Sequence, residues 1–195
     1  MSTSRRRKRG YHHGDLRAAT VQAAAELLEK QGPAAVVLRE VARKAGVSHN
    51  APYRHFPTRE ALLAALAAQG FREFAEHMRG AAGASMGEAY VGFALARPQL
   101  FRLMFGGALR LGTDPELAAA SRGAYDGLVG AFRARGDVAD PELAAAAAWA
   151  LVHGLAHLLL DGHFERATDG GRARAEFVRR VVGSVRFAAA PQRGA

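Results

Sequence analysis

One stretch of the sequence, residues 38–56, constrains the fold more than any other; it reads LREVARKAGVSHNAPYRHF. Its first half carries apolar residues at the spacing of one helix face, with charged residues on the opposite face: Leu38, Val41, Ala42 and Ala45. Gly46 then favours the left-handed conformation that ends a helix, and Ser48 offers a side-chain oxygen that can cap another. A helix, a tight glycine turn and a second helix predict a helix-turn-helix unit.

The second helix of this unit is too polar for its length to be buried. Its side chains suit phosphates and base edges, so we interpret it as the recognition helix of a DNA-binding domain. Its start has two alternatives, because Pro52 lies at the fourth helical position if Ser48 is the cap and at the tolerated start if Asn50 is the cap. We expect the early residues to lie nearest the bases, and Tyr53 and His55 to lie nearer the phosphates. The predicted DNA-contacting residues of the unit are Arg39, Ser48, His49, Asn50, Ala51, Tyr53, Arg54 and His55.

Positive charge is concentrated in the same part of the chain. Up to Arg59, twelve Lys and Arg stand against four Asp and Glu, whereas fifteen stand against fourteen from Glu60 onward. A basic first third joined to a near-neutral remainder indicates a head that binds a polyanion and a body that binds something else. The basic run at residues 5–9 is expected to be a disordered arm that follows the phosphate backbone or enters a minor groove; the alternative is a solvated tail.

Three segments of the head carry a family resemblance: Gly46-Val47-Ser48, Tyr53-Arg54-His55-Phe56 and Pro57-Thr58-Arg59-Glu60-Ala61-Leu62. Together they resemble the amino-terminal domain of the TetR family of one-component transcriptional regulators, over about residues 15–66. The resemblance implies that Arg59 touches the DNA backbone and that a fourth helix links the head to the body. One departure is Val37, where the family often has a Ser or Thr cap.

The rest of the chain shows helix signals and no sustained alternation of apolar and polar residues. Asp15, Thr58, Asp114 and Asp140 are placed to cap helices, and Pro follows the last two. These signals predict an all-α fold of about nine helices. Besides the recognition helix, the expected helices cover residues 16–31, 38–45, 58–79, 86–96, 98–105, 115–135, 142–160 and 171–189.

A second resemblance lies in the body. Trp149-Ala150-Leu151-Val152-His153-Gly154, with residues 90–94 and 98–105, resembles the carboxy-terminal ligand-sensing domain of one TetR subgroup, which is named for its Trp, His and Gly. The resemblance implies a small-molecule effector. We expect an apolar cavity that takes a small hydrophobic or aromatic compound, with His153 as its polar anchor; the alternative is a filled core. The predicted lining residues are Phe93, Phe101, Met104, Phe105, Tyr125, Trp149 and His153.

These readings give four parts to the chain. We expect a disordered basic arm at residues 1–13, a three-helix helix-turn-helix DNA-binding domain at 14–60, a connecting helix and break at 61–84, and a helical ligand-sensing and dimerisation domain at 85–190. Two apolar helices, residues 142–160 and the last one around residues 177–187, are expected to form a homodimer interface. A dimer would present two recognition helices to double-stranded DNA at a fixed spacing, as a palindromic site requires.

Other kinds of site find less support. His153, His157 and Asp161 lie on one helix, but the first and last are separated by about 12 Å along its axis, so one ion cannot bind all three. No metal or cofactor site is therefore expected, and the sequence has no cysteine for a thiolate ligand. No apolar run reaches the roughly 18–20 residues of a membrane span, and a cytoplasmic location is expected.

The leading hypothesis is a ligand-responsive repressor and not an enzyme. No paired carboxylates, activated nucleophile or phosphate-binding glycine loop supports catalysis. The alternatives are a helical enzyme with a DNA-binding adaptor head, and a DNA-binding protein without a ligand response.

Overall fold

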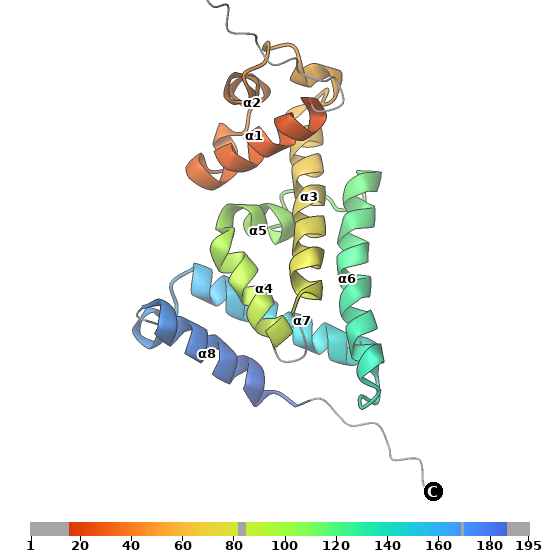
Figure 1. Cartoon of the computed structure of the whole chain (residues 1–195), viewed down its shortest axis with the longest axis vertical. Helices are drawn as coiled ribbons and strands as arrows, with labels where there is room; N and C mark the ends of the chain where they lie inside the picture. Colours follow the sequence, from red (N-terminus) through yellow and green to blue (C-terminus); the bar gives the residue numbers. More distant parts are fainter. Residues whose placement is uncertain (1–15, 82–84, 169, 187–195) are drawn as a thin grey trace, which may run out of the picture. The chain divides into compact units, whose positions relative to one another are not determined.

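The computed structural model describes residues 16–81, 85–168 and 170–186 (Figure 1). Within these ranges the chain forms eight α-helices and three short 3-10 helices, and it has no β-strand. The elements are α1 (Leu16–Gln31), η1 (Pro33–Ala35), α2 (Leu38–Ala45), η2 (Pro52–Arg54), α3 (Arg59–Arg79), α4 (Ser85–Ala96), α5 (Pro98–Phe105), α6 (Pro115–Arg135), α7 (Pro141–Leu160), η3 (Glu165–Ala167) and α8 (Gly171–Ser184). The predicted arm and the predicted cap Asp15 lie outside the described residues.

The all-α prediction is confirmed, but the number of helices is not. Eight α-helices are found in the described ranges where about nine were expected. The expected recognition helix accounts for the difference, because its segment forms only the 3-10 turn η2 (Pro52–Arg54). The last helix is also shorter than predicted: α8 ends at Ser184, and Val185 has extended backbone angles. The predicted end at residue 189 lies outside the described residues.

Local capping chemistry explains where several helices begin and end. Gly46 has a φ of 70°, and the N–H groups of Gly46 and Val47 donate to the carbonyls of Arg43 and Ala42, which is the glycine-closed end that the sequence predicted for α2. The N–H of Ala61 donates to Thr58 Oγ1 at 3.1 Å, which confirms the predicted cap of α3.

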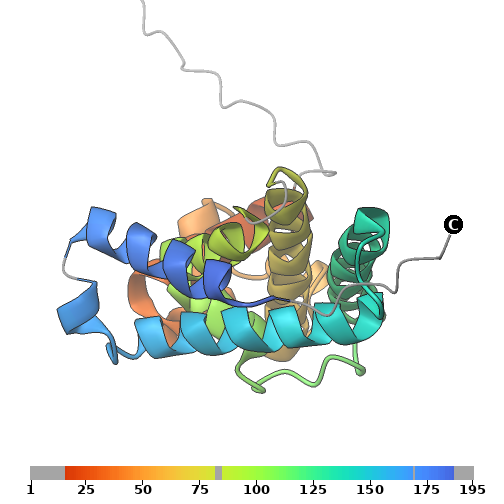
Figure 2. The ribbon, with the colours of Figure 1, turned by 90° about the horizontal axis from the view of Figure 1, so that it is seen from below.

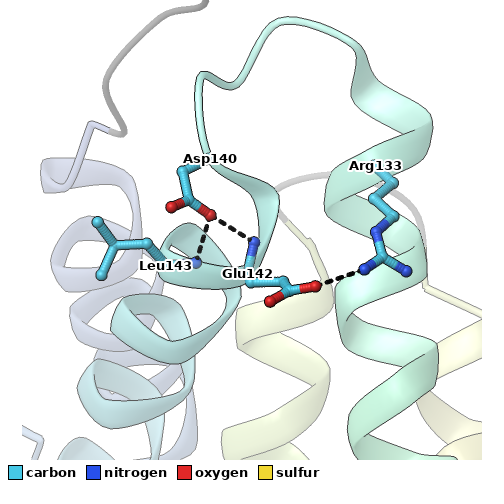
Figure 3. A network of polar contacts seen from close by, with 4 residues as sticks. All are labelled: Arg133, Asp140, Glu142 and Leu143. Atoms are coloured by element: carbon cyan, nitrogen blue, oxygen red, sulfur yellow. Dashed lines mark hydrogen bonds and ion pairs between the residues drawn. The ribbon is translucent and has the colours of Figure 1, made fainter.

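Two aspartates begin the long helices of the body, as predicted. Asp114 accepts a hydrogen bond from the N–H of Leu117 at 2.9 Å at the start of α6. Asp140 accepts from the N–H groups of Glu142 and Leu143, both at 3.0 Å, at the start of α7 (Figure 3). Glu142 also accepts a hydrogen bond from Arg133 at 2.6 Å, and this ion pair joins α7 to α6 (Figure 3).

The described residues divide into two compact units, one up to Leu66 and one from Ala67 onward, and the division falls within α3. In the first unit, α1, α2, the two short 3-10 helices and the start of α3 enclose a core of fully buried side chains. Its members include Leu28, Val36, Val41, Ala42, Leu62 and Leu66, all at 0–1% exposure. Burying such side chains is the main source of stability in a helical unit of this size.

In the second unit, α4 packs against α7 and α8, and α6 packs against α7 (Figures 1 and 2). Two glycines permit close helix contacts. A Cβ added at Gly87 on α4 would lie 2.7 Å from Val182 Cγ1 on α8, and one at Gly70 on α3 would lie 2.8 Å from Met104 Sδ on α5. A larger residue at either position would push these helices apart.

The helix α7 departs from one expectation. It has 20 residues and a mean hydropathy of 1.8, so by length and composition it could cross a membrane, although no run of that length was expected. Only 28% of its most apolar window is buried within the chain. Much of its apolar surface therefore remains uncovered in a single copy.

Candidate nucleic-acid interface and ligand cavity

The predicted recognition segment is a turn followed by a short 3-10 helix. The N–H of Ala51 donates to the carbonyl of Ser48 at 2.9 Å, and Ala51 is the N-cap residue of η2 without a side-chain cap. Neither Ser48 nor Asn50 is therefore the cap that was expected. Pro52 occupies the first turn of η2, where its missing N–H costs no hydrogen bond. The N–H of Phe56 donates to the carbonyl of Pro52 at 2.9 Å, which closes one further turn.

Most predicted DNA-contacting side chains lie on the surface of the first unit. Tyr53 is 46% exposed, and Ala51 is half-buried. The exposed members of the set are Arg39, Ser48, His49, Asn50, Tyr53, Arg54 and His55. Hydroxyl, amide, imidazole and guanidinium groups are thus exposed on both sides of the buried Pro52, and Arg39 adds a guanidinium from α2. These groups can donate hydrogen bonds to phosphate oxygens and base edges.

Arg59 has an internal role that the sequence did not indicate. Its Nε donates to the carbonyl of Val36 at 2.8 Å, and its Nη2 donates to the carbonyl of Pro33 at 2.5 Å. Both carbonyls belong to the segment between α1 and α2. Arg59 therefore ties the start of α3 to this connection, and only part of its guanidinium remains for DNA.

Two contacts join the recognition segment and α2 to α1. Phe56 is buried, and the guanidinium of Arg17 lies 5.5 Å from the centre of its ring. Lys44 on α2 lies 2.7 Å from Glu26 on α1. The hydrogen bond from Lys44 lowers the pKa of the Glu26 carboxyl, so this ion pair persists at neutral pH.

The second unit contains a cavity of about 920 Å³, within the range of small-ligand sites. Residues of α3, α4, α5, α6, α7 and α8 line it, together with Ala81 after α3, Leu111 between α5 and α6, and Val185 and Arg186 after α8. Its aromatic lining residues are Phe71, Phe74, Tyr90, Phe105, Tyr125, Phe132 and Trp149. A second hollow of about 480 Å³ shares Phe105, Leu111 and Trp149 with the first.

The predicted ligand residues separate into three groups. Phe105, Tyr125 and Trp149 line the larger cavity. Met104 and His153 line the smaller hollow and not the larger one. Phe93 and Phe101 are buried at 7% and 0% exposure and line neither, so they contribute to the packed interior.

A hydrogen-bonded chain joins three of the polar groups near the cavity. The indole N–H of Trp149 donates to the Tyr90 hydroxyl oxygen at 3.1 Å, and that oxygen lies 2.9 Å from Nδ1 of His153. An indole can only donate, so the Tyr90 oxygen accepts from Trp149, and the direction of its hydrogen bond with Nδ1 of His153 depends on the tautomer of the imidazole. Burial raises the pKa of Tyr90. Burial is also the larger cause of the lowered pKa of His153, and the charge of nearby His157 is the smaller one. The three hydrogen-bonded side chains, Trp149, Tyr90 and His153, are therefore uncharged.

His157 and Asp161, which follow His153 along the chain, have different surroundings. The ring of His157 lies 4.6 Å from that of His153, centre to centre. Asp161 accepts a hydrogen bond from Arg102 Nη2 at 2.6 Å, and Arg102 also donates to the carbonyl of Leu160. The ion pair joins α5 to the end of α7.

Several lining residues of the larger cavity were not predicted from sequence. They include Tyr90, Phe74 and four arginines: Arg79, Arg122, Arg135 and Arg186. Residues 90–94 carried only a family resemblance in the sequence, and no contact was predicted for Tyr90. Its partner His153 lies 63 positions away. No local pattern brings such distant residues together.

An exposed polar turn beside an amphipathic helix, together with a helical unit that encloses an apolar cavity, defines the class of helix-turn-helix regulators. Residues 21–66 match the family described as "Bacterial regulatory proteins, tetR family", and residues 84–185 match the "Tetracyclin repressor-like, C-terminal domain". The second match covers more than half of the 195 residues. The chain therefore belongs to the TetR family of bacterial transcriptional regulators, as the resemblance in the head predicted.

Three relatives illustrate the similarity. A protein of unknown function from Rhodococcus sp. RHA1 is 35% identical with a TM-score of 0.73, and the match covers 91% of this chain and 94% of that one. A tetR-family transcriptional regulator from Streptomyces coelicolor, 22% identical over 89% of this chain and 80% of its own, shares the fold with a TM-score of 0.69. An HTH-type transcriptional repressor from Mycobacterium tuberculosis is 38% identical over 61 residues, which are 31% of this chain and 32% of that protein. The chain thus matches about a third of that curated relative's length.

Proposed function

We propose that the protein is a DNA-binding transcriptional repressor that acts as a homodimer on a palindromic operator and responds to a small apolar effector. The observation that carries the DNA-binding part is the set of exposed polar side chains at residues 48–50 and 53–55 on a strongly basic first third of the chain. The Mycobacterium tuberculosis relative, which is named a repressor, supports the sign of regulation. Two of the similar proteins named above are transcriptional regulators, which supports a second unit that binds a ligand and does not catalyse a reaction.

The homodimer is supported by the uncovered face of α7. Leu143 is 67% exposed and Leu158 is 41% exposed, and between them small residues occupy the same helix face: Ala146, Ala147, Ala150 and Gly154. Small residues let two helices approach closely, and a second copy would cover the leucines. We expect α8 to complete the interface with its half-buried Phe177, Val181 and Val182.

The effector response is supported by the cavity and by the continuity of α3. This helix supplies residues 59–66 to the first unit and lines the cavity in the second with Phe71, Phe74 and Met78. A ligand releases DNA only if it binds the DNA-incompetent arrangement more tightly than the competent one. We propose that cavity occupancy acts through α3, and we retain the Trp-His-Gly subgroup as the proposed class of the body.

Fluorescence anisotropy on labelled DNA from the region upstream of the protein's own gene tests the DNA-binding part. We expect saturable binding that survives competition by unrelated DNA at about 150 mM salt, because non-specific phosphate contacts weaken steeply there. Equal binding to both DNAs would contradict a sequence-specific regulator.

Sedimentation of Leu143→Glu tests the interface. The wild type is expected to sediment as a dimer at micromolar concentration and the variant as a monomer, because a buried carboxylate without a partner is strongly unfavourable. Val37→Glu is the matched control, since Val37 is 39% exposed in the first unit and should leave the dimer intact. A monomeric wild type would remove the homodimer from the proposal.

A further inference from the structure

The charged residues that line the larger cavity are almost all of one sign. Among the described lining residues there are four arginines and one acid, Asp126, and the remaining lining is mainly apolar. An apolar cavity with excess positive charge favours a ligand that has an apolar body and carries negative charge. The charges around the cavity therefore point to an effector with an acidic group.

Three of the four arginines have contacts within the chain. Arg135 Nε and Nη2 donate to the two carboxylate oxygens of Asp137, each at 3.0 Å. Arg79 lies 3.9 Å from Glu76, and Arg186 donates to the carbonyls of Gly183 and Val185. All three lie at or near the carboxyl ends of their helices, where a cation also offsets the partial negative charge of the unpaired carbonyls. The guanidinium groups of these three arginines therefore already have partners within the chain.

Arg122 differs from the other three. It lies in the middle of α6, away from the helix ends, and no Asp or Glu of the described chain pairs with it. It lies one helical turn before Tyr125, whose ring is 5.7 Å from that of Trp149 in the cavity wall. An exposed guanidinium thus borders an aromatic wall, and its five donors remain for a ligand.

We propose that the cavity takes an amphipathic carboxylate, an aliphatic or aromatic body with one carboxylate group, and that Arg122 binds the carboxylate. This inference rests on the proposed effector response and names its ligand class. The apolar body lies among Phe74, Phe105 and Trp149, while the carboxylate stays at the exposed rim and avoids the cost of burying a charge. The planar guanidinium matches a carboxylate with two parallel hydrogen bonds. An ammonium head group would instead meet the like charge of Arg122.

Trp149 provides a direct test, because it is the only tryptophan in the sequence and lines the cavity. Decanoate, 1-decanol and decylamine carry the same apolar chain and differ in charge; each is titrated into the full chain at pH 7 while Trp149 fluorescence is followed. We expect decanoate to bind about tenfold more tightly than decanol and decylamine to bind most weakly, since a charged hydrogen bond is worth about one factor of ten or more. Decanol binding as tightly as decanoate would overturn the proposal.

Three variants assign the preference to Arg122. Arg122→Gln should lose about tenfold in decanoate affinity and keep its decanol affinity, whereas Arg122→Lys should retain part of the preference because it retains the charge. The control is Arg133→Gln on the same helix; Arg133 pairs with Glu142 and does not line the cavity, so both affinities should be unchanged. Wild-type decanoate affinity in Arg122→Gln, or equal loss of preference in Arg122→Lys, would exclude Arg122 as the anchor.

The fluorescence titration contains no DNA, so its result is independent of operator binding. Selective decanoate binding without sequence-specific DNA binding would support the ligand class and contradict the proposed repressor. Specific DNA binding without any carboxylate preference would support the repressor and overturn the ligand class.

Discussion

The two units of the chain use their apolar side chains differently. In the first unit, the large apolar side chains that remain exposed among the described residues are Val37 and Tyr53, and Tyr53 belongs to the predicted DNA-contacting set. In the second unit, six remain exposed: Leu111, Tyr125, Leu143, Trp149, Leu158 and Val185. Apolar surface left uncovered on this scale is typical of binding surfaces.

The difference follows from what each unit must bind. DNA is polar and negatively charged, so a DNA-contacting surface needs donors and positive charge, and the apolar residues can all serve the core. A cavity and a dimer face instead require apolar residues that the isolated unit does not cover. We infer that the first unit is the more completely packed of the two, and that its core tolerates substitution less well.

The largest effect is expected from removing the same side chain in each unit. Leu28 is fully buried in the first unit, whereas Leu128 is half-buried and already faces the cavity. Leu28→Ala should cost about 3 kcal/mol of unfolding free energy, because it opens a new void, and Leu128→Ala should cost about 1 kcal/mol. Urea unfolding followed by circular dichroism and by Trp149 fluorescence measures both, and equal costs would mean that the cavity wall is as tightly packed as the first core.

The next effect concerns two glycines of α4. A Cβ at Gly87 would lie 2.7 Å from Val182 Cγ1, a stiff β-branched side chain, while one at Gly92 would meet nothing within 4 Å. Gly87→Ala should destabilise the second unit by about 2 kcal/mol, since a packed contact must open. Gly92→Ala is the matched control and should stabilise it by up to about 1 kcal/mol through the lower entropy of the unfolded chain. Thermal unfolding of both variants checks the contrast, which would fail if the two alanines had the same effect.

A smaller effect is expected for DNA affinity. Tyr53→Ala should weaken binding to every DNA sequence by about 1–2 kcal/mol through a lost phosphate contact, whereas Asn50→Ala should change which base is preferred. Gln31→Ala, an exposed change at the end of α1, is the control. Anisotropy titrations against a set of operator variants distinguish the two. Unchanged affinity in Tyr53→Ala with uniform weakening in Asn50→Ala would reverse the assigned roles.

The helix boundaries could be predicted from sequence where they depend on neighbouring residues. Gly46, Thr58, Asp114 and Asp140 each act within three positions of the helix end that they define, so their chemistry is visible in the sequence. The recognition segment was predicted wrongly as a full helix. Pro52 and the polar residues before it favour a turn, and only one 3-10 turn follows.

The cavity could be predicted only in part. The aromatic residues of the body were expected to lie together, but their spacing does not reveal which of them face a void and which fill the core. Phe101 is fully buried, and Phe105, one turn later on the same helix, lines the cavity. The cation Arg122 and the hydrogen bond between Tyr90 and His153 depend on contacts between helices far apart in the sequence.

The smallest expected effect is a difference in how the two units respond to acid. In the second unit, burial and then His157 lower the pKa of His153 below its ordinary value of 6.5. In the first unit, the hydrogen bond from Lys44 lowers the pKa of Glu26 below 4.5. Both shifts favour the deprotonated form in the folded chain, so each contributes stability that is complete above the unfolded pKa and is lost as the pH falls through the folded pKa.

The contribution of His153 is lost at a higher pH than that of Glu26. As the pH falls, the second unit should begin to lose stability near pH 6.5, where an unfolded chain binds a proton at His153 more readily than the folded one does. The first unit should lose the contribution of Glu26 only below about pH 4.5. Urea unfolding at a series of pH values, followed by Trp149 fluorescence for the second unit, should show the earlier loss in the wild type and in His163→Gln, an exposed control, but not in His153→Gln. If His153→Gln loses stability between pH 6.5 and 4.5 as steeply as the wild type, the neutral chain of Trp149, Tyr90 and His153 is not what makes the second unit sensitive to acid.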